Sequence, residues 1–306
     1  MNDLPVRRFH TSVAYGTNIC AARQNGRYSF RRATTLVGDV ELHPVPDLAR
    51  GTAAAMPPGA LSVYHANVRS LKKQLGDLRA SAPILDRHDV IAVTETWLND
   101  TVADSELELG FRDHTWFRRD RCSRGGGVAC AVRTSLLPQR LPDPDGAECL
   151  LIHLRGCSIT VAVCYRPPDD DGALGRTIDA LSMLQDCKLI LVGDFNLPEI
   201  TWNVSHSVPE LTRQTVRASH FLHSCDAMGL RQWVSEATRG ERTLDLIFTR
   251  RLQARVHVRD GLFISDHKET VATVSVPRSR PPAPSRRTAY SYQSADFGTL
   301  RRSLSK

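Results

Sequence analysis

The amino-acid sequence predicts a mixed α/β (α+β) fold in which two β-sheets pack face to face and helices cover their outer surfaces. Short apolar segments rich in β-branched residues recur between residues 61 and 276, a pattern typical of buried strands. A few longer segments place apolar residues at helical spacing. Several neighbouring strands are separated by only a few residues, which favours hairpins and a sheet-on-sheet core over a purely parallel sheet.

The first half of this domain is expected to contain strands, a helix and a hairpin. Residues 61–64 form the first expected strand. Ser70 can cap a helix that has three leucines on one face, Leu71, Leu75 and Leu78. Residues 90–93 and 128–132 form the next strands, the latter directly after the triple glycine at 125–127. No Lys-Ser/Thr pair and no helix follow these glycines, so a tight hairpin is favoured over a phosphate-binding loop.

The second half continues with further strands and two helices. Residues 150–154 and 159–165 are expected to form two strands, and Pro167 and Pro168 follow the second because proline interrupts sheet pairing. The remaining expected elements are a helix with Leu174, Ile178, Leu181 and Leu184 on one face, a strand at 189–193, a helix with Leu211, Ala218, Phe221, Leu222 and Cys225, and strands at 243–248, 256–258 and 270–276.

Both ends of the chain carry positive charge. The formal net charge is +7, of which residues 1–57 contribute +3 and residues 277–306 contribute +6, so the central part is slightly negative. Residues 1–57 show no periodic pattern, and we expect a basic, disordered leader there, with an organellar transit segment as the alternative. The folded domain is expected at residues 58–277, followed at 278–306 by a Pro/Arg-rich linker and a connector fragment.

The composition argues against several classes of protein. No window approaches the roughly 18 consecutive apolar residues of a membrane span, and the N-terminus lacks the apolar core of a secretory signal. The eight cysteines are scattered and form no Cys-x-x-Cys pair, so we expect buried free thiols rather than a zinc site or a disulfide framework. The near-neutral central part does not by itself indicate a nucleic-acid partner.

Polar side chains follow several expected strands at the points where the strands end. In Gly193-Asp194-Phe195-Asn196, alternation along an extended chain sends Asp194 and Asn196 to the same side. A polar turn is the alternative interpretation of this stretch. Other polar residues at or within the expected strands are Asn67, Glu95, Tyr165, Arg166, Asp245, Asp266 and His267. Such a set suits phosphoester hydrolysis, which needs carboxylates for a hard cation, a base for water, and donors for the phosphate.

The order of these motifs resembles that of the endonuclease/exonuclease/phosphatase (DNase I-like) family, whose members include DNase I and the apurinic endonucleases. Within it, the chain is most similar to the endonuclease domain of jockey-like non-LTR retrotransposons, over about residues 58–277. This similarity is carried by the stretches at 67–71, 94–98, 119–128 and 165–168. The resemblance implies a four-layer α-β-β-α sandwich.

The resemblance also implies how the chain would hold metal and activate water. Glu95 resembles the main Mg²⁺ ligand, with Asn67 and Asp266 near the metal; Mn²⁺ is an alternative ion. Asp194 resembles the residue that orients and deprotonates the attacking water, and Asn196 assists it.

A second group of matched residues would contact the phosphate. His267 resembles the histidine that contacts the scissile phosphate, and Asp245 resembles the carboxylate that orients this histidine. A nearby carboxylate raises the pKa of an imidazole, which suits a histidine that donates to an anion. Tyr165 would donate to a phosphate oxygen. Arg166 would bind the substrate in the same way or would pair with an acid.

The sequence therefore leads us to expect a Mg²⁺-dependent DNA endonuclease of retrotransposon origin that nicks one strand and leaves a 3′ hydroxyl. Arg69 stands where repair-type relatives carry an acid, which puts a repair role in doubt. We expect a truncated element without its reverse transcriptase, acting as a monomer on DNA and not on membranes. The alternatives are a phosphatase or phosphodiesterase of the same fold that acts on small or lipid substrates, and an inactive retroelement remnant.

Overall fold

The computed structural model describes residues 19–24, 27–32, 59–121, 125–184, 186–202, 209–276 and 297–304. The chain divides into an N-terminal unit, Met1–Ala54, and a second unit, Ala55–Lys306. In the first unit, β1 (Ile19–Gln24) and β2 (Arg27–Arg32) pair antiparallel. These strands were not expected in a leader without a periodic pattern. The rest of the expected leader lies outside the described residues.

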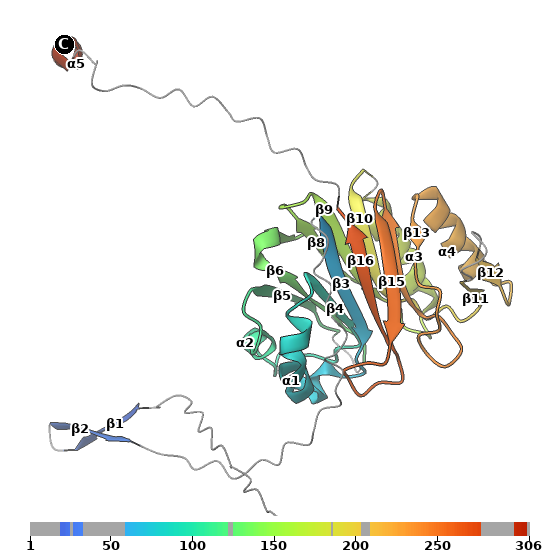
Figure 1. The fold of residues 1–306 in the computed structure, drawn as a ribbon, viewed down its shortest axis with the longest axis horizontal. Helices are drawn as coiled ribbons and strands as arrows, with labels where there is room; N and C mark the ends of the chain where they lie inside the picture. Colours follow the sequence, from blue (N-terminus) through green and yellow to red (C-terminus); the bar gives the residue numbers. More distant parts are fainter. Residues whose placement is uncertain are drawn as a thin grey trace, which may run out of the picture. The chain divides into compact units, whose positions relative to one another are not determined.

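Two six-stranded sheets form the second unit (Figure 1). The first sheet has the order β15-β16-β3-β4-β6-β5, with strands β3 (Ala60–Asn67), β4 (Val90–Thr94), β5 (His114–Arg119), β6 (Val128–Arg133), β15 (Gln253–Arg259) and β16 (Glu269–Ser275). The second sheet has the order β13-β14-β10-β9-β8-β7, with strands β7 (Pro138–Arg140), β8 (Glu148–Leu154), β9 (Ile159–Tyr165), β10 (Lys188–Asp194), β13 (Arg231–Gln232) and β14 (Asp245–Arg250). A separate short pair consists of β11 (Ile200–Thr201) and β12 (Glu210–Leu211).

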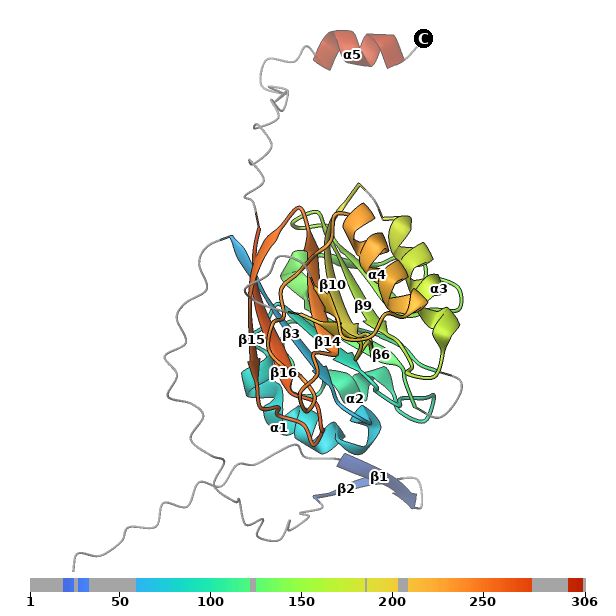
Figure 2. The same cartoon turned by 90° about the vertical axis from the view of Figure 1, so that its right-hand side faces the viewer.

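The helices lie on the outer faces of the two sheets. The 3-10 helix η2 (Leu71–Lys73), α1 (Leu75–Leu85) and α2 (Asp104–Glu108) belong to one side, and α3 (Asp171–Ser182) and α4 (Val216–Ala227) belong to the other (Figure 2). A further 3-10 turn, η3, covers Thr134–Leu136, and α5 covers Phe297–Leu304. No described helix is long and apolar enough to span a membrane.

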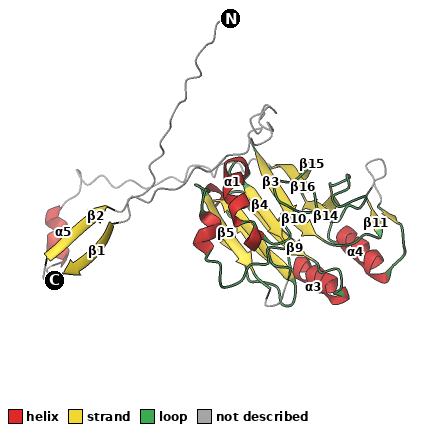
Figure 3. Cartoon of the chain, turned by 90° about the horizontal axis from the view of Figure 1, so that it is seen from below, coloured by secondary structure: helices red, strands yellow, loops and turns green. Residues whose placement is uncertain are grey.

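Three apolar clusters account for this layering. One cluster fills the space between the sheets, and it contains Val63 and Val90 from one sheet and Val161 and Ile190 from the other. A second cluster joins the outer face of the β10 sheet to α3 and α4, and a third joins the outer face of the β3 sheet to α1 (Figure 3). Because each sheet buries both faces, the predicted α-β-β-α sandwich is confirmed.

Several predicted boundaries differ from the structure. Ser70 adopts a left-handed conformation (φ 93°) and makes no capping hydrogen bond, so α1 begins only at Leu75, after η2. Leu211 belongs to β12 rather than to the helix that follows, which Thr215 caps by accepting from the backbone N–H of Ala218. The triple glycine leads into β6 as expected, but eight residues separate β5 from β6, so this hairpin is not tight.

The prediction that the cysteines are free thiols is wrong for one pair. Cys149 of β8 and Cys164 of β9 face each other directly across the antiparallel pair and form a disulfide. Cross-strand neighbours at this register place their side chains close together, which the linear spacing of the two residues does not reveal. Four other described cysteines are free: Cys130, Cys157, Cys187 and Cys225.

Candidate active site

The candidate site forms where two parallel strand pairs end. In the first sheet, Asn67 ends β3 and pairs with Thr94 at the end of β4. In the second sheet, Tyr165 ends β9 and pairs with Asp194 at the end of β10. The carboxyl ends of neighbouring parallel strands lie at the same edge of a sheet, where α/β proteins commonly bind ligands. The antiparallel strand β14 begins at this edge as well, with Asp245 directly opposite Asp194.

A single amide joins the two sheets at this edge. The side-chain Nδ2 of Asn67 donates to Glu95 Oε1 at 3.0 Å and to Asp194 Oδ2 at 2.9 Å. Glu95 also accepts from the Tyr165 hydroxyl at 3.2 Å and from the Trp97 indole Nε1 at 3.3 Å. The structure thus brings together Asn67, Tyr165 and Asp194, which end β3, β9 and β10, and Glu95, which directly follows β4.

Asn196 fixes the orientation of Asp194. Its backbone N–H donates to Asp194 Oδ1 at 3.0 Å, and its side-chain Nδ2 donates to Asp194 Oδ2 at 3.0 Å and to the carbonyl of Arg166 at 2.8 Å. Gly193 precedes Asp194 because a Cβ at this position would collide with the backbone carbonyl oxygen of Cys164 on β9. The close approach of β9 and β10 therefore requires glycine here.

Arg166 lies differently from the substrate-binding residue that we expected. Its side chain is buried, and the guanidinium donates to the backbone carbonyls of Asn196 at 2.9 Å and Pro168 at 3.3 Å. A buried guanidinium that donates to backbone carbonyls holds the adjacent loop in place. The buried Arg166 guanidinium is thus directed toward the loop that carries Asn196.

Asp245 and His267 form a buried pair beside Asp194. The Nδ1 of His267 donates to Asp245 Oδ2 at 2.8 Å. The backbone N–H of His267 donates to the Ser265 hydroxyl, which donates in turn to the carbonyl of Asn67 at 2.7 Å. Behind this pair lies His65, whose Nδ1 is 3.9 Å from Asp245 Oδ1. The loop that carries His267 is therefore tied to β3 through the Asn67 carbonyl and to β14 through Asp245.

The pKa values of three groups in and beside the site, Asp194, His267 and His65, are shifted by their surroundings. Burial, followed by the negative charge of Asp245, raises the pKa of Asp194 to about 8. Burial would lower the pKa of His267, but the hydrogen bond and charge of Asp245 and the charge of Asp194 raise it above its usual value. Burial is the main reason that the pKa of His65 falls to about 4. Strongly perturbed groups of this kind, gathered at strand ends, are typical of functional sites.

Backbone strain is concentrated in the same loops. Among the described residues, eight non-glycine residues have positive φ, and five of these lie in the loops of the site: Arg69, Ser70, Glu95, Trp97 and Asn196. The left-handed conformation is costly for residues with a Cβ and persists only where the surrounding contacts enforce it. At Glu95 the φ of 53° accompanies a side chain held by hydrogen bonds from both sheets.

Asp266 lies at the rim of the site. Its Oδ1 is 3.1 Å from Arg69 Nη1, and its Oδ2 is 2.7 Å from Arg239 Nη2 and 2.8 Å from Arg239 Nε. Burial would raise the pKa of Asp266, but the hydrogen bond and charge of Arg239 and the charge of Arg69 hold it below its usual value. Both oxygens of the residue that we expected near the metal are thus engaged with guanidinium groups.

The donor set fits a hard divalent cation. The hydrogen bonds that the structure shows for Glu95 and Asp194 come only from neutral groups, so neither carboxylate has a direct cationic partner among them. Such uncompensated carboxylates suit a cation with oxygen ligands.

A different group of ligand atoms is more compact. One atom each of Asp194, Asp245 and His267 lie within 4.8 Å of one another. Asp245 and His267 are already bonded to each other, however, whereas Glu95 forms no ion pair with the part of the chain that the structure describes. On chemical grounds we therefore favour Glu95 over His267 as the centre of a metal site.

Sequence reasoning assigned no role to three residues near the site: His65, Trp97 and Arg239. Trp97 directly follows the Glu95 motif, and His65 interrupts an apolar strand two residues before Asn67, so both carried a local signal. Arg239 lies in a turn that precedes β14, and no local pattern connects it with Asp266.

Comparisons with known proteins bear on the family and the fold of this chain. Residues 159–271 match the model of a family described as endonuclease-reverse transcriptase. No curated protein matches the chain by sequence.

Several solved structures have the same fold. The endonuclease domain of TRAS1, a telomere-specific non-LTR retrotransposon, is 17% identical, with a TM-score of 0.52 over 71% of this chain and 100% of that one. The AP endonuclease LMAP from Leishmania major is 17% identical, with a TM-score of 0.58 over 76% and 93% of the two chains. The 3′-5′ exonuclease NExo from Neisseria meningitidis is 16% identical, with a TM-score of 0.54 over 69% and 98%. The DNase I-like fold and the resemblance to the endonuclease/exonuclease/phosphatase family are thereby confirmed.

Proposed function

We propose that this chain, with its DNase I-like fold, is a metal-dependent endonuclease that hydrolyses a phosphodiester bond of DNA and nicks one strand. The observation that carries this proposal is the convergence of Glu95, Asp194 and the Asp245–His267 pair at one edge of the two sheets. This edge offers a cation ligand, a base and a donor for the phosphate, which are the parts that phosphodiester hydrolysis requires.

Asp194 is the proposed base. It is fully buried, held by Asn67 and Asn196, and has a pKa raised to about 8. A carboxylate with a raised pKa accepts a proton more readily than an ordinary one. In the proposed reaction, Asp194 takes a proton from water while the water oxygen bonds to phosphorus. The bond from phosphorus to the 3′ oxygen breaks and this oxygen takes a proton from solvent, so that the products are a 3′ hydroxyl and a 5′ phosphate.

His267 is the proposed donor to the scissile phosphate. Because Nδ1 donates to Asp245, the ring is fixed in orientation and Nε2 is the nitrogen left for the phosphate. The raised pKa keeps His267 protonated over a wider pH range, so that Nε2–H can donate to a phosphate oxygen that gains charge. Tyr165 lies beside Glu95 and would donate to a second phosphate oxygen.

Glu95 would hold the cation, with Asn67 beside it, and Mg²⁺ is the proposed ion, with Mn²⁺ as an alternative. When bound, such an ion supplies charge stabilisation to the phosphate and its leaving oxygen. The strained backbone at Glu95 and its hydrogen bonds to Asn67, Tyr165 and Trp97 keep the carboxylate in place before any ion binds.

A retrotransposon origin is supported by the family match at residues 159–271 and by the similarity to the TRAS1 endonuclease domain. In that setting the 3′ hydroxyl of the nick would serve as a primer. Arg69, in place of the acid of repair-type relatives, is consistent with this origin. DNA is accordingly the proposed partner.

The proposal is tested with supercoiled plasmid and purified protein. We expect Mg²⁺-dependent conversion to nicked circles whose 3′ ends a polymerase extends without further treatment. Nicking should be lost in Asp194→Ala and His267→Ala. Release of phosphate from soluble phosphoesters without nicking would instead indicate a phosphatase. Nicking by both variants at the wild-type rate would indicate a contaminating nuclease.

A further inference from the structure

Two arginines share one carboxylate at the rim of the site. Arg69 follows β3, Arg239 lies in the turn before β14, and Asp266 precedes His267, so the three residues come from three separate segments. Each oxygen of Asp266 engages a different guanidinium, at distances of 2.7 to 3.1 Å. We call Arg69, Asp266 and Arg239 the rim cluster.

The three segments of the rim cluster are anchored to the proposed catalytic residues. The backbone N–H of Arg69 donates to Asn67 Oδ1 at 3.2 Å. Thr238, next to Arg239, is fully buried, and its hydroxyl accepts from the backbone N–H of Asp245 at 3.1 Å. Its carbonyl accepts from the backbone N–H of Lys268 at 2.7 Å. Both guanidinium groups are therefore carried by backbone that is fixed to the site.

The rim cluster carries excess positive charge at the surface. Two guanidinium groups face one carboxylate, and the side chains of Arg69, Arg239 and Asp266 are 50%, 42% and 39% exposed. Arg239 uses Nε and Nη2 on Asp266, and each guanidinium has five N–H donors in all. The two groups together offer more donors than one carboxylate accepts.

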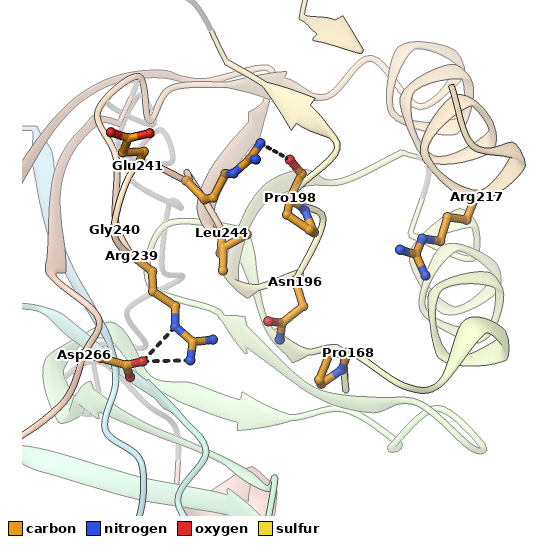
Figure 4. Close-up of a pocket in the computed structure, with 10 residues that line it drawn as sticks. Pro168, Asn196, Pro198, Arg217, Arg239, Gly240, Glu241, Leu244 and Asp266 are labelled. Atoms are coloured by element: carbon orange, nitrogen blue, oxygen red, sulfur yellow. Dashed lines mark hydrogen bonds and ion pairs between the residues drawn. The ribbon is translucent and has the colours of Figure 1, made fainter. Parts of the chain in front are cut away.

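The rim cluster borders a cavity of about 720 Å³. Figure 4 shows Arg239 and Asp266 on one side of this cavity, Pro168 and Asn196 near them, and Arg217 on α4 across from them. Asn196 also contacts Asp194. Arg239 and Asp266 thus line the same cavity as Asn196, the residue that holds the proposed water-activating Asp194.

We propose that Arg69 and Arg239 bind a backbone phosphate of the substrate strand next to the scissile phosphate, and that Asp266 positions these arginines rather than ligating the metal. This inference rests on the proposed function. Planar guanidinium groups recognise phosphate oxygens through paired N–H donors, and an acid shared by two of them limits their rotation before the strand arrives.

A surface ion pair without function is the competing interpretation, since exposed pairs contribute little to stability. The two interpretations differ in DNA binding, which can be measured without catalysis. The test uses the full chain, a fluorescent DNA duplex and EDTA, with affinity measured over a range of salt concentrations. Arg251→Gln is the matched control, because Arg251 follows the far end of β14 and pairs with Asp186 at 3.9 Å.

We expect Arg239→Gln to weaken binding about tenfold and to reduce the slope of log affinity against log salt by about 0.9. The double variant Arg69→Gln/Arg239→Gln should bind more weakly still, but without a second slope loss of this size, because both arginines contact the same phosphate. Arg239→Lys should keep the slope but bind more weakly, because lysine keeps the charge and lacks the fork. If the Arg69 and Arg239 variants bind DNA as tightly as Arg251→Gln does, the inference is overturned. The proposed function would still stand in that case, provided that the wild-type protein nicks plasmid. Absence of any wild-type binding would overturn the proposed function as well.

The role of Asp266 is tested by its response to metal. We expect Asp266→Asn to keep the Mg²⁺-induced rise in melting temperature and the Mg²⁺ concentration for half-maximal nicking within about twofold of wild type. A metal ligand would behave differently, since loss of even a supporting contact weakens metal binding about 10- to 100-fold. An increase of that size in the Mg²⁺ requirement would return Asp266 to the metal and overturn this part of the inference.

Discussion

Asp194 is the residue at which stability and activity are most clearly opposed. Its carboxyl is fully buried opposite Asp245, and like charges directly opposite each other on paired strands destabilise a sheet. Its folded-state pKa of about 8 lies above the ordinary value near 3.9. In the absence of metal, the folded state is therefore penalised increasingly as the pH rises from about 4 to about 8.

Asp194→Asn should remove this penalty. We expect loss of nicking by about 10²- to 10⁴-fold, the usual contribution of a general base, together with a higher melting temperature in EDTA at pH 8. Each kcal/mol added to the free energy of unfolding raises the melting temperature by about 2–4 °C for a domain of this size. The gain should vanish below about pH 3, where wild-type Asp194 is protonated in both the folded and the unfolded state. A variant that melts lower than wild type at pH 8 would contradict this account.

The Asp245–His267 pair gives a pH prediction of defined sign. Activity requires protonated His267 and ionised Asp194 in the proposed mechanism. Asp245→Asn removes the charge that raises both pKa values, so both limbs of the pH–rate profile should move to lower pH. Single-turnover nicking rates measured across the pH range provide the test. An alkaline limb that does not move would show that the reaction does not require protonated His267.

Most residues that the sequence predicted for the site lie close together in the structure, but the sequence did not predict how their side chains are oriented. Asp194, Glu95 and Asn67 could be singled out because each polar side chain lies at or just after the end of an apolar strand. Arg166 was assigned to the substrate because its position after β9 resembled the others, yet its side chain donates to the carbonyls of Asn196 and Pro168. The Arg166 side chain contacts Asn196, which lies 30 residues further along the chain. The residues around Arg166 in the sequence do not indicate this contact.

At the scale of the elements, the parallel pair β9–β10 controls the placement of Asp194. Gly193 lies on β10 beside Cys164 of β9. Of the described glycines, it is the one at which an added Cβ would collide with the Cys164 carbonyl oxygen. Since backbone atoms on a central strand cannot move aside, any side chain at Gly193 must push β10 away from β9 and displace Asp194.

Gly193→Ala should therefore lower the free energy of unfolding by about 2 kcal/mol or more and reduce nicking. Gly175→Ala is the matched control, because Gly175 lies in α3 with open space around its Cα. Alanine in a helix is favoured over glycine by about 0.5–1 kcal/mol, so the control should be slightly more stable than wild type. Denaturant unfolding of both variants measures the difference. Equal stability of the two variants would show that β9 and β10 tolerate a side chain.

Elements with strong apolar patterns were predictable, and those held by tertiary contacts were not. The strands around 61–64, 90–93 and 189–193 were identified because their residues are continuously apolar. Strand β5 was missed because its sequence, His-Thr-Trp-Phe-Arg-Arg, is largely polar, as suits a strand at the edge of a sheet. Strands β7 and β13 have three and two residues, too few to show any period.

At the scale of the whole molecule, two sheets must pack before the site exists. Asn67 and Glu95 come from one sheet, and Tyr165 and Asp194 from the other. The face-to-face packing followed from the hairpins and the apolar strands. The pairing of Cys149 with Cys164 did not follow, because the register of β8 against β9 is fixed only in the folded sheet.

A cation held by Glu95 would stabilise the folded domain. A metal ion that binds only the folded state adds about 2.7 kcal/mol to the free energy of unfolding when its concentration is 100 times the dissociation constant. We expect Mg²⁺ to raise the melting temperature of wild type and to leave Glu95→Gln unchanged. Glu108→Gln, an exposed glutamate on α2, should respond like wild type. A full Mg²⁺ response in Glu95→Gln would place the ion elsewhere.

The most direct test of the central claim, that the edge shared by the two sheets is a phosphodiester-hydrolysing site, is plasmid nicking by wild type and Asp194→Asn prepared in parallel. Asp194→Asn keeps the shape of the side chain and removes its ability to accept a proton from water. The account predicts Mg²⁺-dependent nicked circles with wild type and almost none with Asp194→Asn, although the variant is folded. Nicking at the wild-type rate by folded Asp194→Asn would contradict it.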